Sequence, residues 1–260
     1  MVRFTSLGIP TILKKIRLLQ GHHQGPQNRG ADHFLTLGEA VLMATREIIY
    51  FGDPMCSWCW GFSPVIKNIS QTYADDAPVS IVVGGLHAFD TDPMNDDYKA
   101  TIQHHWEDVS TATGAVFDYA FFDREGFVLD TEPACRAAVT VRDMDKSKLL
   151  HFYDSISRSF YSENKDTTNV EIFKLLATEA GLDADAFQEQ FESDALKETT
   201  RRDFQYAKEL GVTGFPTVVV KENEGEDAKL ALLSAGYQPY DSLAPIIDDW
   251  LKNGLRENSS

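Results

Sequence analysis

Residues 53–62 are DPMCSWCWGF, a stretch that places two of the chain's three cysteines three positions apart. An apolar run, IIYF at residues 48–51, comes before it, separated by Gly52 alone. Cysteines at i and i+3 lie on one face of a helix, with Cα atoms about 5–6 Å apart, which a disulfide tolerates. The spacing fits a redox-active dithiol, a metal site or two buried free thiols.

The sequence around the cysteine pair has the pattern of a βαβ unit. Residues 48–51 are apolar and β-prone, residues 56–73 carry apolar side chains at helical spacing, and VSIVV at residues 79–83 is a second apolar strand. This order places the cysteines where the first strand passes into the helix. A helix N-terminus favours negative charge, so we expect the pKa of Cys56 to fall below the ~8.5 of free cysteine.

Helical periodicity dominates the middle of the chain, and two strands at residues 217–222 and 229–236 follow before a last helix. The pattern predicts an α/β protein with a mixed four-stranded sheet flanked by helices and a large all-helical insertion. We assign residues 44–90 and 196–254 to the sheet domain and residues 91–195 to the insertion. Residues 1–43, basic and partly without periodicity, are predicted to be a disordered or non-catalytic extension.

Composition argues against several functional classes. The chain has 24 basic and 40 acidic side chains and a net charge of −16, which repels phosphate backbones and anionic membranes. It has no run of ~18 apolar residues and no signal-peptide pattern, and three cysteines are too few for a disulfide-stapled secreted domain. We therefore expect a cytoplasmic protein with no nucleic-acid or membrane partner.

The number of ligands argues against zinc, because structural zinc takes four and the chain has no second CxxC. An inert buried pair remains an alternative, since free cysteine is often a core residue. The third cysteine, Cys135 in TEPACRAA, is either another redox thiol or a small core residue. Its position among alanines favours the core.

A second motif, GVTGFPTVVV at residues 211–220, puts Pro216 directly before a strand, where proline is tolerated. DPMCSWCWGF, this GFPT and the helical stretch between them resemble the DsbA-like branch of the thioredoxin superfamily, and within it the FrnE-like group of cytosolic protein-disulfide isomerases. The resemblance covers about residues 45–254. It implies a thioredoxin fold, with Cys56 as nucleophile, Cys59 as resolving thiol and Pro216 as a cis-proline beside which substrate docks.

Neighbouring residues complete the predicted site. We expect Trp58 to offer an apolar surface to substrate, and Phe215 and Thr217 to contact its backbone. Asp53 is a candidate proton relay; the alternative is that Asp53 and Pro54 are turn formers.

The predicted function is that of a thiol–disulfide oxidoreductase or isomerase for protein or small-thiol substrates, without metal or organic cofactor, glutathione being an optional co-substrate. Better-known periplasmic relatives have Pro-His between the cysteines where this chain has Ser57-Trp58, so strong oxidising power is not implied. Kappa-type glutathione transferases have Ser where Cys56 stands, and the two cysteines favour redox chemistry instead. The alternatives are a non-catalytic adaptor and a kappa-type glutathione-dependent transferase or isomerase.

Overall fold

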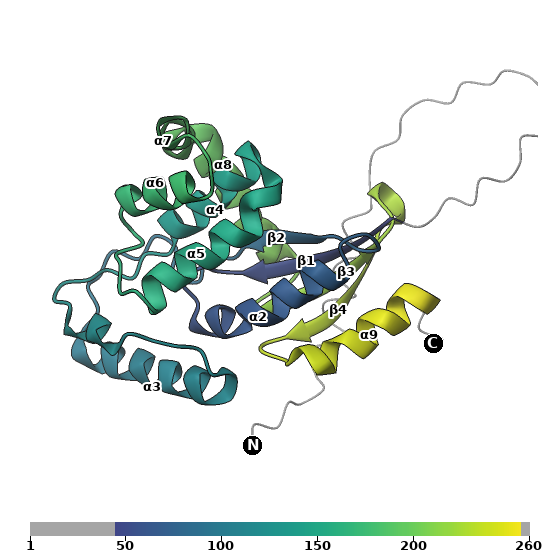
Figure 1. Cartoon of the computed structure of the whole chain (residues 1–260), viewed down its shortest axis with the longest axis horizontal. Coiled ribbons are helices and arrows are strands. Elements are labelled where there is room, and N and C mark those ends of the chain that lie inside the picture. Colours follow the sequence, from purple (N-terminus) through teal and green to yellow (C-terminus); the bar gives the residue numbers. More distant parts are fainter. Residues whose placement is uncertain (1–44, 256–260) are drawn as a thin grey trace, which may run out of the picture.

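Four strands form one mixed sheet in the order β2-β1-β3-β4 in the computed structural model, which describes residues 45–255 (Figure 1). The predicted extension at residues 1–43 lies outside the described residues. The strands are β1 (Arg46–Gly52), β2 (Val79–Val83), β3 (Thr217–Glu222) and β4 (Lys229–Ala235). β1 runs parallel to β2 and antiparallel to β3, and β4 pairs antiparallel with β3 with a register shift between Val218 and Val219.

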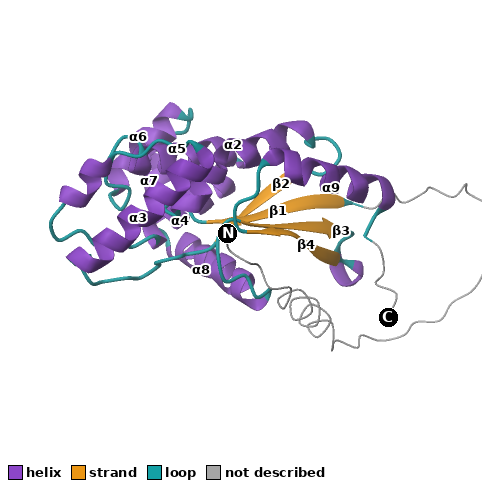
Figure 2. Ribbon diagram, turned by 90° about the horizontal axis from the view of Figure 1, so that it is seen from below, coloured by secondary structure: helices purple, strands orange, loops and turns teal. Residues whose placement is uncertain are grey.

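Helices cover both faces of the sheet, which explains why β1 is apolar without alternation. Ile48 and Tyr50 pack on one face beneath α2 (Ser57–Thr72) and α9 (Tyr240–Asn253). Ile49 and Phe51 pack on the other face against α8 (Asp194–Glu209). Figure 2 shows α2 and α9 above the sheet and α8 below it.

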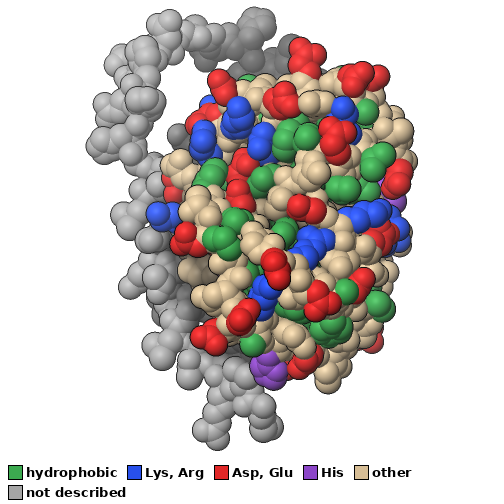
Figure 3. All heavy atoms as spheres, turned by 90° about the vertical axis from the view of Figure 1, so that its left-hand side faces the viewer, with side chains coloured by type: hydrophobic (Ala, Val, Ile, Leu, Met, Phe, Trp, Pro, Cys, Tyr) green, Lys and Arg blue, Asp and Glu red, His purple; other side chains and the backbone are tan. Residues whose placement is uncertain are grey.

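Five helices lie between β2 and α8 and form the predicted helical insertion. They are α3 (Asp96–Thr113), α4 (Glu132–Met144), α5 (Leu149–Tyr161), α6 (Val170–Glu179) and α7 (Ala184–Glu192). Side-chain oxygens of Asn95, Asn169 and Asp183 accept backbone N–H groups at the starts of α3, α6 and α7, which fixes where each helix begins. Figure 3 shows the end of the molecule formed by these helices, where acidic and basic side chains intersperse with small apolar groups.

The insertion and the sheet share one hydrophobic core. α5 packs on α2, and α4 packs on α8 and β2. Buried residues from both parts belong to the same cluster, among them Cys59 of α2 and Phe152 of α5. The fold class is confirmed, whereas the division at residues 91 and 195 stays a prediction. Over residues 45–255, no helix combines the length and apolarity needed to cross a membrane.

Candidate active site

The cysteine pair lies at the start of α2. Cys56 is the N-cap residue: its amide donates to the Asp53 carbonyl over 3.0 Å and its carbonyl accepts the Trp60 amide over 3.0 Å. Cys59, one turn further, is completely buried, and 5% of Cys56 is exposed. Both sulfurs are free thiols. Cys56 is therefore the one of the two that solvent can reach.

The loop before β3 covers Cys56. The thiol donates to the Phe215 carbonyl oxygen over 3.6 Å, and the peptide bond between Phe215 and Pro216 is cis, as the resemblance implied. The Phe215 ring lies directly over Gly84 at the end of β2, where a Cβ would come within 1.8 Å of the ring. Only glycine permits this close approach. Phe215 thus links the start of α2, through its carbonyl, to the end of β2, through its ring.

The side chains of the three predicted substrate contacts, Trp58, Phe215 and Thr217, differ in solvent exposure. Trp58 is half-buried, with its ring centroid 6.1 Å from that of Tyr237. Thr217 is buried, and its hydroxyl donates to the Gly214 carbonyl over 2.8 Å, which leaves little of the side chain for a substrate. Phe215 is partly exposed.

Asp53 is completely buried behind the cysteine pair. One carboxylate oxygen accepts the Met55 amide over 2.8 Å, and the other accepts the Leu86 amide over 2.7 Å and the Cys135 thiol over 3.5 Å. The Met55 contact is ordinary turn chemistry, but the Leu86 and Cys135 contacts join β1 to the β2 end and α4. Burial raises the pKa of Asp53, while these donors partly offset the increase.

The electrostatics of Cys56 differ from the sequence-based expectation. Hydrogen bonding with Cys59 and then burial raise the pKa of the Cys56 thiol above its ordinary value. The expected lowering is therefore wrong for the reduced protein. The helix N-terminus favours a thiolate, but the neighbouring Cys59 sulfur and the loss of solvent both disfavour it, and the loss of solvent is not visible in the sequence.

Buried tyrosines around the sulfurs were missed from the sequence. Tyr50 of β1 and Tyr153 and Tyr161 of α5 are each at most 2% exposed. Burial and then the charge of a neighbouring cysteine raise the pKa of each phenol. The alternation of side chains along β1 could have predicted that Tyr50 lies on the face of the sheet covered by α2, near the cysteines. Nothing local in the α5 sequence linked its tyrosines to the cysteines.

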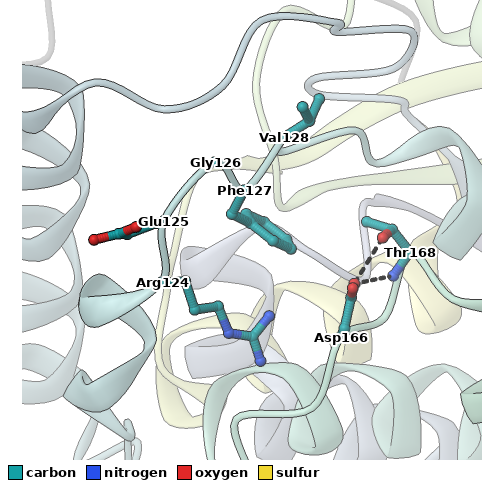
Figure 4. A pocket seen from close by; sticks show the side chains of 7 residues that line it. All are labelled: Arg124, Glu125, Gly126, Phe127, Val128, Asp166 and Thr168. Carbon is teal, nitrogen blue, oxygen red and sulfur yellow. Dashed lines mark hydrogen bonds between the residues drawn. The ribbon is translucent and has the colours of Figure 1, made fainter.

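A pocket of about 520 Å³ opens elsewhere, in the insertion (Figure 4). Its lining residues are Arg124, Glu125, Gly126, Phe127, Val128, Asp166 and Thr168, none of them a cysteine. The Arg124 guanidinium lies 5.2 Å from the centre of the Phe127 ring, and Asp166 accepts both the amide and the hydroxyl of Thr168. None of the residues that line the pocket therefore belongs to the cysteine pair.

Comparisons with known proteins agree with this geometry. A protein from Nitrosomonas europaea, provisionally described as a protein disulfide isomerase, is 38% identical, with a TM-score of 0.74 over 80% of this chain and 98% of its own. The cytosolic disulfide reductase DsbM of Pseudomonas aeruginosa shares the fold at 23% identity, with a TM-score of 0.63 over 78% of this chain and 98% of its own.

A curated relative has a different role. The ClpXP adapter protein SpxH of Halalkalibacterium halodurans is 23% identical over 212 residues, which are 79% of this chain and 67% of SpxH. Residues 47–248 match the family described as the DSBA-like thioredoxin domain. The chain therefore belongs to the DSBA-like thioredoxin family.

Proposed function

We propose that the protein is a thiol–disulfide oxidoreductase in which Cys56 attacks and Cys59 resolves. The observation that carries the proposal is the position of Cys56: a free thiol at the start of α2, one turn from a second free thiol and in contact with the Phe215 carbonyl. Two sulfurs at this spacing exchange between dithiol and disulfide with little backbone motion.

In the proposed reaction the Cys56 thiolate attacks a substrate disulfide and forms a mixed disulfide, releasing the first substrate thiol. Cys59 then attacks the Cys56 sulfur, and the second substrate sulfur leaves as a thiol. We assign proton relay to Asp53, whose charge is near enough to raise the pKa of Cys56. A buried carboxyl with a raised pKa is a better base near neutral pH than an exposed one.

Substrate contacts are proposed at Trp58, at the exposed part of Phe215 and at the backbone of Pro216 and Thr217. Protein disulfides and small thiols both fit this description. Glutathione as a co-substrate and a cytoplasmic location are further parts of the proposal. Exchange with oxidised glutathione and fractionation of cells expressing the full chain test them respectively.

Reduction of insulin disulfides with dithiothreitol, which returns the Cys56–Cys59 disulfide to the dithiol, tests the activity. We expect turnover by the wild-type protein, none by Cys56→Ser, and a trapped mixed disulfide with Cys59→Ser. Cys135→Ser is the matched control because it removes a buried thiol outside the pair and should keep turnover. Full activity of Cys56→Ser would overturn the proposal. The reduction potential of the pair gives the direction: near −270 mV is typical of a reductant and near −120 mV of an oxidant.

A second candidate, a non-catalytic adaptor, is favoured by the SpxH relatives, which are named as ClpXP adapters. An adaptor binds its client without using the thiols. If the protein is an adaptor, the wild type should not reduce insulin. A Cys56→Ser, Cys59→Ser double variant should still bind the partner. An oxidoreductase instead reduces insulin as the wild-type protein, and its double variant loses covalent capture of the substrate.

A further inference from the structure

Two tyrosine hydroxyls are buried together beside the cysteine pair. Tyr50 is 0% exposed and Tyr153 is 2% exposed, and their rings meet edge to face with centroids 5.9 Å apart. Tyr50 also packs on Phe62 of α2, with ring centroids 5.8 Å apart. Phe62 lies one turn beyond Cys59 on the same helix face. Tyr50 therefore lies under the face of α2 that carries Cys59.

Gly52 allows the two hydroxyls to meet. A Cβ at Gly52 would lie 2.6 Å from the Tyr153 hydroxyl oxygen and 2.7 Å from that of Tyr50. Both distances are too short for any side chain, so the pair of hydroxyls occupies the space that glycine leaves free. Residues 50 and 52 share a face of β1 because strand side chains alternate.

The hydroxyls have an order relative to the sulfur. Tyr50 interacts with both the Cys59 sulfur and Tyr153, whereas Cys59 acts on Tyr153 only through its charge, so Tyr50 is the nearer of the two phenols to the sulfur. Yet within residues 45–255 neither hydroxyl has a hydrogen bond of ordinary geometry. A neutral thiol is a weak acceptor, whereas a charged acceptor makes hydrogen bonds about twice as strong. These donors are most effective when the Cys59 sulfur is negatively charged.

We propose that Tyr50 and Tyr153 form a donor chain that stabilises the charged Cys59 sulfur while it resolves the mixed disulfide. The inference rests on the proposed oxidoreductase function. In the step concerned, a sulfur–sulfur bond forms between Cys59 and Cys56, and the bond between Cys56 and the substrate breaks. The proton lost by Cys59 leaves with the substrate thiol, and both tyrosines keep theirs.

The test follows the reduced protein mixed with excess dithiobis(nitrobenzoate) in a stopped-flow instrument. Attack by Cys56 releases one coloured thiolate in a phase that depends on reagent concentration, and attack by Cys59 releases a second in a phase that does not. We expect Tyr50→Phe to slow the second phase roughly 10- to 100-fold, as removal of a hydrogen bond to a charged group predicts. The pH at half-maximal rate should rise by about one unit or more. Tyr153→Phe should change both quantities in the same direction but less.

Tyr73→Phe is the matched control. Its hydroxyl donates to Asp248 over 2.9 Å at the opposite end of α2, so both phases should be unchanged. An unchanged second phase and pH profile in Tyr50→Phe, with two phases in the wild type, would overturn the inference. If Tyr50→Phe does not fold, Tyr153→Phe decides by the same criteria. Failure of the proposed function is distinct, because the wild type would then show no second phase dependent on Cys59.

Discussion

The Cys56 sulfur lies 3.6 Å from the carbonyl oxygen of Phe215, a residue 159 positions further along the chain. The next residue is Pro216, which has no N–H, so the loop offers the sulfur an acceptor without an adjacent competing donor. The Phe215 ring rests on Gly84, which in turn donates from its amide to the Gly52 carbonyl over 2.8 Å. The environment of the sulfur therefore depends on how the end of β2 supports this loop.

Gly84→Ala tests that support. The added Cβ would come within 1.8 Å of the Phe215 ring, so the ring must shift from its place beside the loop that contacts Cys56. Overpacking of this kind costs about 1–3 kcal/mol. We expect a lower free energy of unfolding in urea by about that amount and at least severalfold slower insulin reduction.

Gly214→Ala is the control for this prediction. Gly214 precedes Phe215 directly, but a Cβ there would meet no atom within 4 Å. The variant should keep both stability and activity close to the wild type. If both alanine variants lost stability and activity equally, the effect would come from any change in the loop and not from the contact between the Phe215 ring and Gly84.

The titration of Cys56 is the second prediction. Because Cys59 and burial raise the pKa of Cys56, thiolate absorbance of the reduced protein should appear above the ~8.5 of free cysteine. Cys59→Ser should lower the midpoint, since Cys59 is the largest cause of the increase. Cys135→Ser serves as background to remove the third thiol. A wild-type midpoint below that of free cysteine would mean that the helix N-terminus outweighs burial.

Cys135 gives the third prediction. Its buried thiol donates to the Asp53 carboxylate over 3.5 Å, so we expect it to stay outside any disulfide between Cys56 and Cys59. After complete oxidation and denaturation we expect one titratable thiol per chain, and peptide mapping should locate it at Cys135. Cys135→Ala should cost about 1–3 kcal/mol by depriving a buried acceptor of a donor, and Cys135→Ser less. Oxidised protein without a free thiol would contradict this assignment.

Periodicity in the sequence was enough to place the elements of the fold. VSIVV and TVVVKE coincide with β2 and β3, and the helix predicted to begin at the cysteine pair is α2 with Cys56 as its N-cap. These segments follow local rules, because their apolar spacing and boundary residues act within one element. Short 3₁₀ segments such as Tyr119–Asp123 were not predicted, because segments of this length are too short to show a periodic pattern of apolar residues.

The surroundings of the sulfurs depend on contacts between distant segments. Two donors to Asp53, the Leu86 amide and the Cys135 thiol, come from beyond the end of β2 and from α4, and the second tyrosine hydroxyl comes from α5. No local pattern specifies such meetings. The direction of the Cys56 pKa shift was missed for the same reason: a helix N-terminus is visible in the sequence, whereas the burial that opposes it is a property of the folded protein.

Asp53 supplies the last prediction, a pH dependence of stability. Burial raises its pKa in the folded protein, so its contribution is fully present below the unfolded pKa of about 3.9 and is lost as pH rises through the folded pKa. Asp53→Asn cannot ionise and lacks this dependence. The stability advantage of wild type over Asp53→Asn should therefore be larger near pH 4 than near pH 7, as measured by urea unfolding at both. Asp92→Asn, the same substitution at an exposed position, is the control for the change of residue type. An advantage that grows toward pH 7 would mean that the Met55 and Leu86 amides and the Cys135 thiol outweigh burial.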